Sequence, residues 1–260
     1  IYLDASHLGA DFIMQNFRGM SLRCRDVGYD LPNAPVVVSP TAHFIMGGLR
    51  IDQDCRTDLE GLFAAGEDAA GVHGANRLGG NGVVESTVFG GIAGDTIAEY
   101  LTEFREGTVQ DSQISEIIET TLKPFKRKQS TSIYSLRDRL KNNMWENAGL
   151  VRSEASLENA DMEMKEIREQ LSSIALTQGD RAFHLEWMEY LSMLNYLDVC
   201  DLIIESAKLR KESRGSHFRS DFPAKENDMP LSNICIRKNQ EVQFSPVMMN
   251  RIMHDASEPV

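Results

Sequence analysis

The chain has 260 residues, of which 42% are hydrophobic and 25% charged, and its formal net charge is −12. This length and composition indicate a soluble globular protein with at least one sizeable core, and they favour two folded units. The negative charge argues against a general nucleic-acid surface or an anionic membrane surface, because either would need a basic face. An anionic ligand must therefore meet a local positive site.

The cysteines and the chain start narrow the class of protein further. No C-x-x-C pair occurs, which fits reduced thiols in a cytoplasmic protein better than a disulfide framework or a zinc site, so we expect no metal. No apolar run approaches the ~18 residues of a membrane span, so we expect no direct membrane insertion. The first residues show no targeting pattern and no starting methionine, which suggests a piece of a longer polypeptide. The four cysteines are Cys24, Cys55, Cys200 and Cys235.

Glycine distribution divides the sequence near residue 105. Twelve of the 19 glycines lie between Gly47 and Gly94, and only three follow Gly107. Residues 34–40 (APVVVSP) and 61–67 (GLFAAGE) are apolar without alternation, which predicts short buried strands of a parallel or mixed sheet. We therefore expect an α/β domain over residues 1–105.

Beyond that boundary the apolar pattern becomes helical. Four segments with a period of 3.6 predict a three- to four-helix bundle over residues 106–223, with breaks at Gly149 and Gly179. Residues 233–238 (NICIRK) and 242–247 (VQFSPV) predict a β-hairpin in a tail of residues 224–260. We expect Trp145, His184 and Trp187 to pack between helices. The predicted apolar faces are Ile114, Ile117, Ile118 and Leu122; Ile133, Leu136, Leu140 and Met144; Met164, Ile167, Leu171 and Ile174; and Phe183, Trp187, Met188, Leu191, Leu194 and Leu202.

A carboxylate follows the second predicted strand, where Gly66 precedes Glu67. Open α/β sheets bind ligands beyond the carboxyl ends of their strands. A carboxylate there can accept hydrogen bonds from ribityl or ribose hydroxyls, and a glycine lets the backbone come close. The alternative is a turn carboxylate that caps the next helix.

The stretch GVHGANRLGGNGVVES, residues 71–86, predicts a glycine-rich loop that leads into a helix. The free N–H groups at the helix start would face an electron-rich group, such as a flavin carbonyl or a phosphate. Glu85 stands where a dinucleotide fingerprint needs glycine, so the pyrophosphate-binding element would lie upstream. The predicted apolar face of this helix consists of Val84, Val88, Ile92 and Ile97.

Two cationic side chains lie near these motifs. His43 separates a predicted strand from Gly47 and Gly48, and Arg77 lies in the glycine-rich loop. Each alone could be structural, His43 as a satisfied strand-end residue and Arg77 as a clamp on loop carbonyls. Together they form a cationic pair that suits a carboxylate.

A third cationic group occurs in RKESRGSHFRSDFP, residues 210–223. Arg214 and His217 are secondary candidates for substrate binding. The alternative is that cations gather at a helix C-terminus to meet its carbonyls and its dipole.

Four motifs, in this order and at these intervals, resemble the C-terminal half of the flavoprotein subunit of the fumarate reductase and succinate dehydrogenase family. They are PTAHFIMGG (40–48), TDLEGLFAAGE (57–67), HGANRLGGN (73–81) and RKESRGSHFRSDFP (210–223). The resemblance extends from residue 1 to about residue 223. It implies FAD across a Rossmann-type domain, with a capping domain closing over a dicarboxylate that stacks on the flavin.

The resemblance also implies roles for individual residues. His43 and Arg77 would bind substrate carboxylates, with Arg214 and His217 as secondary candidates. The implied reaction is hydride exchange between flavin N5 and a dicarboxylate carbon of the succinate and fumarate type. The implied FAD contacts are Gly66, Glu67, His73, Asn81, Gly82, Val83 and Val84.

Parts of such an enzyme are expected upstream of this chain, including the nucleotide fingerprint, the capping segment and the proton-transferring arginine. We therefore expect the chain alone neither to hold FAD tightly nor to turn over. Ile45 and residues 81–83 depart from the family pattern, which leaves an L-aspartate oxidase-like enzyme or another dicarboxylate flavoenzyme as an alternative. A non-catalytic module that docks an iron–sulfur electron-transfer subunit is the rival from another class. Such a partner would bring a cytoplasmic protein to a membrane.

Overall fold

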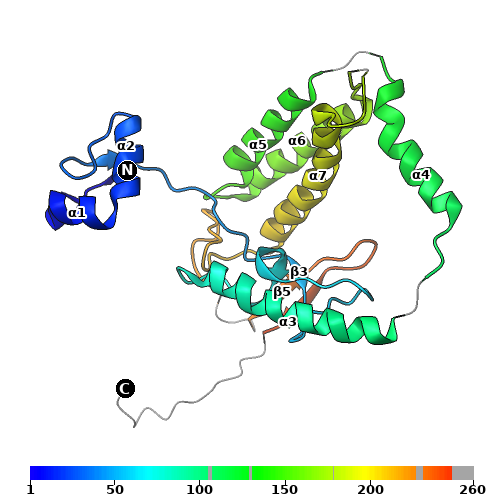
Figure 1. The fold of residues 1–260 in the computed structure, drawn as a ribbon, viewed down its shortest axis with the longest axis horizontal. Coiled ribbons are helices and arrows are strands. Elements are labelled where there is room, and N and C mark those ends of the chain that lie inside the picture. Colours follow the sequence, from blue (N-terminus) through cyan, green and yellow to red (C-terminus); the bar gives the residue numbers. More distant parts are fainter. Residues whose placement is uncertain (105–106, 129–130, 178, 227–230, 248–260) are drawn as a thin grey trace, which may run out of the picture. The chain divides into compact units, whose positions relative to one another are not determined.

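The computed structural model describes residues 1–104, 107–128, 131–177, 179–226 and 231–247 (Figure 1). The chain separates into two compact units, residues 1–43 and residues 44–260. Among the described residues, every helix is too short or too polar to cross a lipid bilayer. All four cysteines carry free thiols.

The first unit is built on a small antiparallel strand pair and two helices. β1 (Tyr2–Leu3) pairs with β2 (Val36–Val37), and the helices are α1 (Ala10–Asn16) and α2 (Arg18–Asp26), preceded by the 3-10 turn η1 (Ser6–Leu8). The predicted strand at residues 34–40 is thus confirmed over two residues only, and its pairing is antiparallel. The core of this unit consists of Ile13, Leu31 and Val36.

The second unit begins with a parallel pair, β3 (Leu49–Arg50) and β4 (Ala69–Ala70). The strand predicted at residues 61–67 is wrong. Phe63 forms only an isolated bridge with Arg56, and residues Gly66–Asp68 form the 3-10 turn η2. The left-handed backbone of Gly66, with φ of +79°, turns the chain and ends any extended run.

Helix α3 (Asn81–Glu103) starts where the sequence predicts. Its buried stripe consists of Glu85, Ala93 and Thr96, whereas Val84 and Val88 are exposed, so the predicted apolar face is wrong in its first two members. Helix α3 packs on the η2 turn, where Gly66 lies against Ser86. Small side chains therefore pack on the turn, and the valines remain on the surface.

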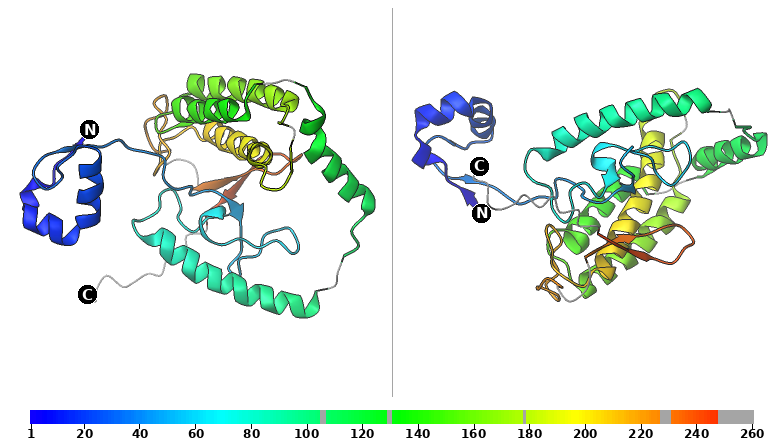
Figure 2. Two further views of the ribbon diagram at one scale, coloured as in Figure 1. Left: turned by 45° about the horizontal axis from the view of Figure 1, so that its top comes forward. Right: turned by 90° about the horizontal axis from the view of Figure 1, so that it is seen from below.

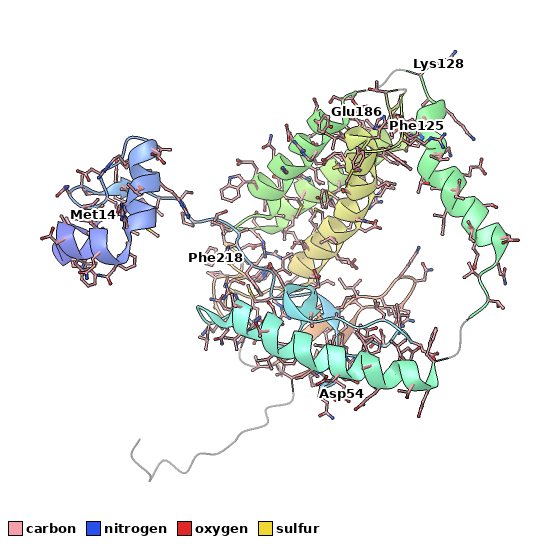
Figure 3. The ribbon with its side chains drawn as sticks, in the orientation of Figure 1. Met14, Asp54, Phe125, Lys128, Glu186 and Phe218 are labelled. Carbon is pink, nitrogen blue, oxygen red and sulfur yellow. The ribbon has the colours of Figure 1, made fainter. Side chains whose placement is uncertain are left out.

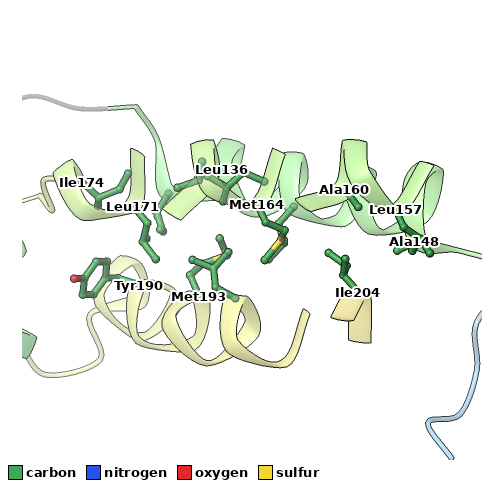
Figure 4. Close-up of a cluster of buried hydrophobic side chains, with 14 of the residues drawn as sticks. Leu136, Ala148, Leu157, Ala160, Met164, Leu171, Ile174, Tyr190, Met193 and Ile204 are labelled. Atoms are coloured by element: carbon green, nitrogen blue, oxygen red, sulfur yellow. The ribbon is translucent and has the colours of Figure 1, made fainter. Parts of the chain in front are cut away.

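Three helices surround the main core: α5 (Ile133–Ala148), α6 (Glu154–Ser173) and α7 (Leu185–Leu209). They lie side by side in both views (Figure 1, Figure 2). A capping box between Ser153 and Ser156 starts α6. Gly149 caps the end of α5 and Gly179 lies between α6 and α7, which confirms both predicted breaks. Figure 4 shows core side chains that include Leu136, Leu157, Met164, Leu171, Tyr190, Met193 and Ile204.

The predicted faces of α5 and α6 are confirmed. The predicted α7 face is confirmed in part, because Trp187, Leu191 and Leu194 pack against the core, and the face predicted at residues 114–122 is wrong. Helix α4 (Asp111–Leu122), followed by the 3-10 turn η3 (Lys123–Lys126), buries no side chain, and its three isoleucines are exposed. Phe183 precedes α7 and is 94% exposed, and Met188 and Leu202 are also exposed. The buried stripe of α7 instead contains Tyr190, Met193, Leu197, Ile204 and Ala207.

One end of the helical core is closed by aromatic and polar contacts. The rings of His184 and Trp187 contact Phe125 edge-on, and Figure 3 labels Phe125 at this end of the helices. Trp187 Nε1 donates to the carbonyl of Thr121 at 2.9 Å, which ties α7 to the end of α4. His184 and Trp187 pack as predicted, but Trp145 is exposed.

The tail forms the predicted hairpin. β5 (Ser232–Cys235) pairs antiparallel with β6 (Gln243–Pro246), and Asn239 adopts a left-handed conformation in the connecting turn. Residues 248–260 of the predicted tail lie outside the described residues.

Candidate functional site

Arg77 is held by an aromatic ring. Its Cζ lies 4.3 Å from the centroid of the Phe44 ring, within the range of a cation–π contact. Its Nη1 donates to the carbonyl of Leu78 at 3.2 Å, and its Nε is buried without a partner. Among the described residues, no carboxylate pairs with this guanidinium. Arg77 thus keeps its positive charge and most of its N–H donors for a ligand.

A buried acid–base pair lies against the same ring. His73 Nε2 is 2.8 Å from Glu85 Oε2, and the two side chains are 7% and 2% exposed. The imidazole contacts Phe44 edge-on, with ring centroids 5.3 Å apart. Glu85 Oε1 is buried and has no partner in the described part of the chain. His73, a predicted FAD contact, is therefore directed toward Glu85 and Phe44.

The start of α3 lies beside Arg77 and Phe44. Gly80, the N-cap residue, is in a left-handed conformation and has no side chain that could cap the first turn. A Cβ on Gly82 would lie 3.2 Å from the Phe44 ring and 3.5 Å from the Arg77 guanidinium, so only glycine fits there without displacing a neighbour. The helix start, with its positive dipole end, and the guanidinium therefore form one positive site. Asn81, Val83 and Val84, the other predicted contacts here, are all exposed.

Glu67 fixes the segment that carries Phe44. Its Oε1 accepts a hydrogen bond from the backbone N–H of Ile45 at 2.9 Å, and the side chain is exposed. Glu67 lies in η2 rather than at a strand end, and Gly66 is buried beside α3. Glu67 therefore has one oxygen engaged and lies on the surface next to the residues around Arg77.

His43 is exposed and is the last residue of the first unit, whereas Phe44 and Arg77 belong to the second. Its pairing with Arg77 on one substrate stays a prediction.

The C-terminal motif contacts the Arg77 loop through its backbone. Arg214 and His217 exchange backbone hydrogen bonds of 2.9 and 3.1 Å, which closes a two-residue turn over Gly215 and Ser216. The N–H and hydroxyl of Ser216 both donate to the carbonyl of Ala75, at 3.0 and 3.3 Å. This turn therefore fixes the backbone two residues before Arg77.

The two secondary candidates are engaged in local contacts. Arg214 Nε donates to Glu212 at 2.9 Å, and Arg214 Nη2 donates to the carbonyl of Glu226 at 2.7 Å. His217 Nε2 donates to the carbonyl of Arg210 at 3.1 Å, and Nδ1 accepts from Arg152 Nη1 at 2.8 Å. These bonds assign His217 to the neutral form with the proton on Nε2.

Burial lowers the pKa of His217 below its usual value, and the charges of Arg152 and Arg219 act in the same direction. The folded state therefore binds the His217 proton less readily than the unfolded state does. We therefore expect the full free energy of unfolding above about pH 6.5, the pKa of histidine in the unfolded chain. It should fall as the pH drops toward the lower pKa of His217 in the folded chain. Urea unfolding midpoints between pH 7 and 5 measure this, and His217→Gln should flatten the fall. An equal fall in both proteins would contradict the assignment.

Gly215 is required by the contact with the Arg77 loop. Its φ is +60°, and a Cβ there would lie 2.0 Å from the carbonyl oxygen of Ala75. We expect Gly215→Ala to separate the turn from the loop and to lower the unfolding free energy by about 1–3 kcal/mol. Thermal unfolding measures this loss, with Gly107→Ala as the control because its Cβ would meet open space. Equal losses in the two variants would rule out the proposed contact.

Arg219 is a further cation of the motif at residues 210–223 that was not predicted as a site residue, and it is fully buried. Its guanidinium donates to both oxygens of Asp221 at 2.8 and 2.7 Å, to Glu154 at 2.8 Å and to the carbonyl of Ala207 at 2.8 Å. A cation thus meets the C-terminal carbonyls of α7, as the alternative for this motif predicts. Phe44 and Glu85 were also missed as site residues. The sequence did contain a signal for Glu85, because it is a charged residue at a helix start that otherwise consists mainly of glycine and valine.

Comparison with known proteins adds the family. The family model described as the FAD binding domain matches residues 1–83, and the model described as the fumarate reductase flavoprotein C-terminus matches residues 137–259. The first match supports FAD as the cofactor that the sequence predicts.

Individual relatives agree with these matches. The chain is 38% identical over 244 residues to a subunit of the CoM/CoB fumarate reductase of Methanothermobacter marburgensis, covering 94% of this chain and 44% of the relative. It is 33% identical over 225 residues to L-aspartate oxidase 1 of Ralstonia nicotianae, covering 86% and 40%. An E. coli quinol fumarate reductase structure superposes with a TM-score of 0.86 at 28% identity, covering 95% and 44%.

The chain thus spans less than half the length of these relatives. Together the two family models match residues 1–83 and 137–259. Fumarate reductases are found both among the relatives by sequence and among the similar structures. The four motifs that suggested the resemblance lie within the residues that the two family models match. The chain belongs to the flavoprotein family of fumarate reductase and succinate dehydrogenase.

Proposed function

We propose that this chain is part of an FAD-dependent oxidoreductase that interconverts a dicarboxylate and its unsaturated form, of the succinate and fumarate type. The observation that carries the proposal is the guanidinium of Arg77. It is fixed on Phe44, its Nε is buried without a partner, and it lies beside the uncapped start of α3. A fixed cation with free donors suits a substrate carboxylate, because a guanidinium can bind both carboxylate oxygens at once.

In this proposal Arg77 binds one substrate carboxylate, and His43 is the second substrate-binding residue. Their roles are to orient the dicarboxylate and to polarise it, so that the reacting carbon is presented in one geometry. Arg214 and His217 stay secondary candidates, and their local hydrogen bonds favour an indirect role through the backbone of the Arg77 loop.

The residues around the start of α3 fit the flavin of FAD. The close approach of Gly82 to Phe44, the uncapped helix turn and the exposed Val83 and Val84 offer N–H donors next to an apolar surface. Bound FAD supplies the hydride-transfer chemistry. The chain's residues would hold its electron-rich edge at the helix start and its sugar hydroxyls at Glu67. The proposed contacts are Gly66, Glu67, His73, Asn81, Gly82, Val83 and Val84.

The finer architecture is part of the proposal. Residues 1–105 would form the C-terminal part of a Rossmann-like FAD-binding domain, residues 106–223 a helical domain and residues 224–260 a tail. The remainder of the flavoprotein, including a capping segment, would complete the site. An iron–sulfur electron-transfer subunit is the proposed protein partner, and it would bring this cytoplasmic chain to a membrane.

L-Aspartate oxidation is the second candidate reaction. The 33% identity to an L-aspartate oxidase favours it, as do Ile45 and residues 81–83, which depart from the usual family pattern near the site. An amino group on the substrate would replace one hydrogen of the dicarboxylate. Comparing succinate with L-aspartate as the reductant of bound FAD separates the two candidates.

The test joins this chain to the remainder of the flavoprotein and follows the flavin absorbance with FAD present. We expect succinate to bleach the oxidised flavin and fumarate to restore the absorbance of the reduced flavin. Bleaching by L-aspartate alone would transfer the assignment to the second candidate. Bound flavin that responds to neither substrate would favour the non-catalytic docking module.

A further inference from the structure

We propose that Phe44, His73 and Glu85 are positioning residues that orient Arg77 for carboxylate binding. The inference rests on the proposed function of Arg77, and it assigns His73 a role through other side chains rather than through direct substrate contact. Four side chains form a chain of contacts: the Glu85 carboxylate, the His73 imidazole, the Phe44 ring and the Arg77 guanidinium. We call this group the Arg77 stack.

The contact between Arg77 and Phe44 holds the cation without using its donors. The quadrupole of an aromatic ring attracts a guanidinium that lies over its face. The N–H groups in the plane of the guanidinium do not bond to the ring, so they stay available to a ligand. Arg139 of the same chain shows the other way of holding an arginine, because Glu163 and Glu166 accept its N–H groups. Arg139 is neutralised by its partners, whereas Arg77 remains able to bind an anion.

The ring in turn needs support from its other neighbours. The edge of His73 packs on Phe44 with an interplanar angle of 75°. Gly82 contacts the ring as well, since a Cβ there would lie 3.2 Å from Phe44 Cε2. A ring fixed on two sides gives the guanidinium a fixed surface, and this fixes the direction in which its donors point.

Glu85 anchors the stack to α3. Its carboxylate comes from the second turn of the helix and binds His73, which lies in the loop before the helix. The burial of this polar pair is weak evidence for stability, because the desolvation of both groups offsets their attraction. The pair instead defines one position for the imidazole, since a hydrogen bond on one ring nitrogen fixes the orientation of the ring. The helix start and Arg77 thereby keep a constant geometry.

The test compares variants in the flavoprotein assembled with FAD. Phe44→Leu removes the aromatic face, and we expect it to raise the dissociation constant of fumarate about tenfold. Phe44→Tyr keeps the face and should stay within about twofold of wild type. Binding to the oxidised flavoprotein is measured by calorimetry, because oxidised flavin cannot reduce fumarate. Steady-state kinetics should show the same rise in KM, with kcat changed by less than about twofold.

Glu85 variants test the far end of the stack and provide a second route if Phe44→Leu fails to fold. Glu85→Ala should weaken fumarate binding about fivefold, and Glu85→Gln should restore it because the amide oxygen still accepts from His73. Glu99→Gln is the control, since this exposed carboxylate lies on the same helix. In ¹⁵N-labelled chain, the Arg77 Nε–H signal should exchange with water faster in Phe44→Leu than in Phe44→Tyr.

The outcomes separate this inference from the proposed function. If Arg77→Lys abolishes binding while Phe44→Leu and Glu85→Ala bind fumarate as wild type does, the positioning role is wrong and the proposed function stands. If Arg77→Lys itself binds normally, the proposed function fails. If Phe44→Leu and Phe44→Tyr weaken fumarate binding equally, the role of the aromatic face is also wrong.

Discussion

Arg77→Lys is expected to lower kcat/KM for fumarate reduction by at least about a hundredfold, equivalent to about 2.7 kcal/mol of transition-state stabilisation. Lysine keeps the charge but loses the planar fork that binds two carboxylate oxygens, and it stacks less well on Phe44. Steady-state kinetics with a reduced electron donor measure the loss. If Arg77 binds the ground state and the transition state equally well, the loss in kcat/KM should appear mostly as a higher KM. If the bond between Arg77 and the carboxylate tightens during the reaction, the loss should appear in kcat.

A second arginine–phenylalanine contact provides the matched control. Arg56 lies 5.7 Å from the centroid of the Phe63 ring, in the same unit as Arg77. Arg56→Lys makes the same chemical change at a contact outside the proposed site, and we expect kcat/KM to stay within about twofold. Equal losses in the two variants would mean that the effect comes from stability and not from substrate binding.

Arg219→Ala is expected to destabilise the folded chain by about 3–5 kcal/mol, the largest stability loss that we predict for a single substitution. The guanidinium is fully buried and binds Asp221, Glu154 and carbonyls at the end of α7. Its removal leaves buried acceptors without donors. Urea unfolding measures the change, and Arg168→Ala is the control because its pairs with Asp198 and Asp201 lie on the surface. Exposed pairs contribute at most about 1 kcal/mol.

The same site predicts an acid-dependent loss of stability. Hydrogen bonds from Arg219 lower the pKa of Asp221 below its usual value. This carboxylate therefore contributes to the free energy of unfolding above about pH 4, the pKa of aspartate in the unfolded chain. The contribution is lost as the pH falls toward the lower pKa of Asp221 in the folded chain. We expect the loss of stability below pH 4 to be smaller in Arg219→Ala, and a loss as large as that of wild type would contradict the pairing.

The helices that sequence patterns predict best are those with one narrow apolar face. Leu136 and Leu140 of α5 and Met164 and Ile167 of α6 are buried as their spacing predicts. Helix α7 carries apolar residues on more than one side, so periodicity alone could not select the stripe that contains Met193. In α3 and α4 the pattern identifies helices, but Val84 and Val88 of α3 and the three isoleucines of α4 remain exposed in the described chain.

The site was predictable where residue type and loop composition determine it. A lone arginine in a glycine-rich loop before a helix marks Arg77, and the structure shows it with a buried Nε that has no partner. The contact with Phe44 depends on how two loops meet, which local sequence does not encode. The strand predicted at residues 61–67 failed for a similar reason, because the turn at Gly66 packs on Ser86 of α3.

The most direct test of the central claim is the binding of fumarate to the oxidised flavoprotein, measured by isothermal titration calorimetry for wild type and Arg77→Ala. If Arg77 holds a substrate carboxylate beside the start of α3, the dissociation constant should rise by about a hundredfold or more while the melting temperature stays close to that of wild type. A dissociation constant within about twofold of wild type would show that another cation binds the substrate, and the account of this site would be wrong.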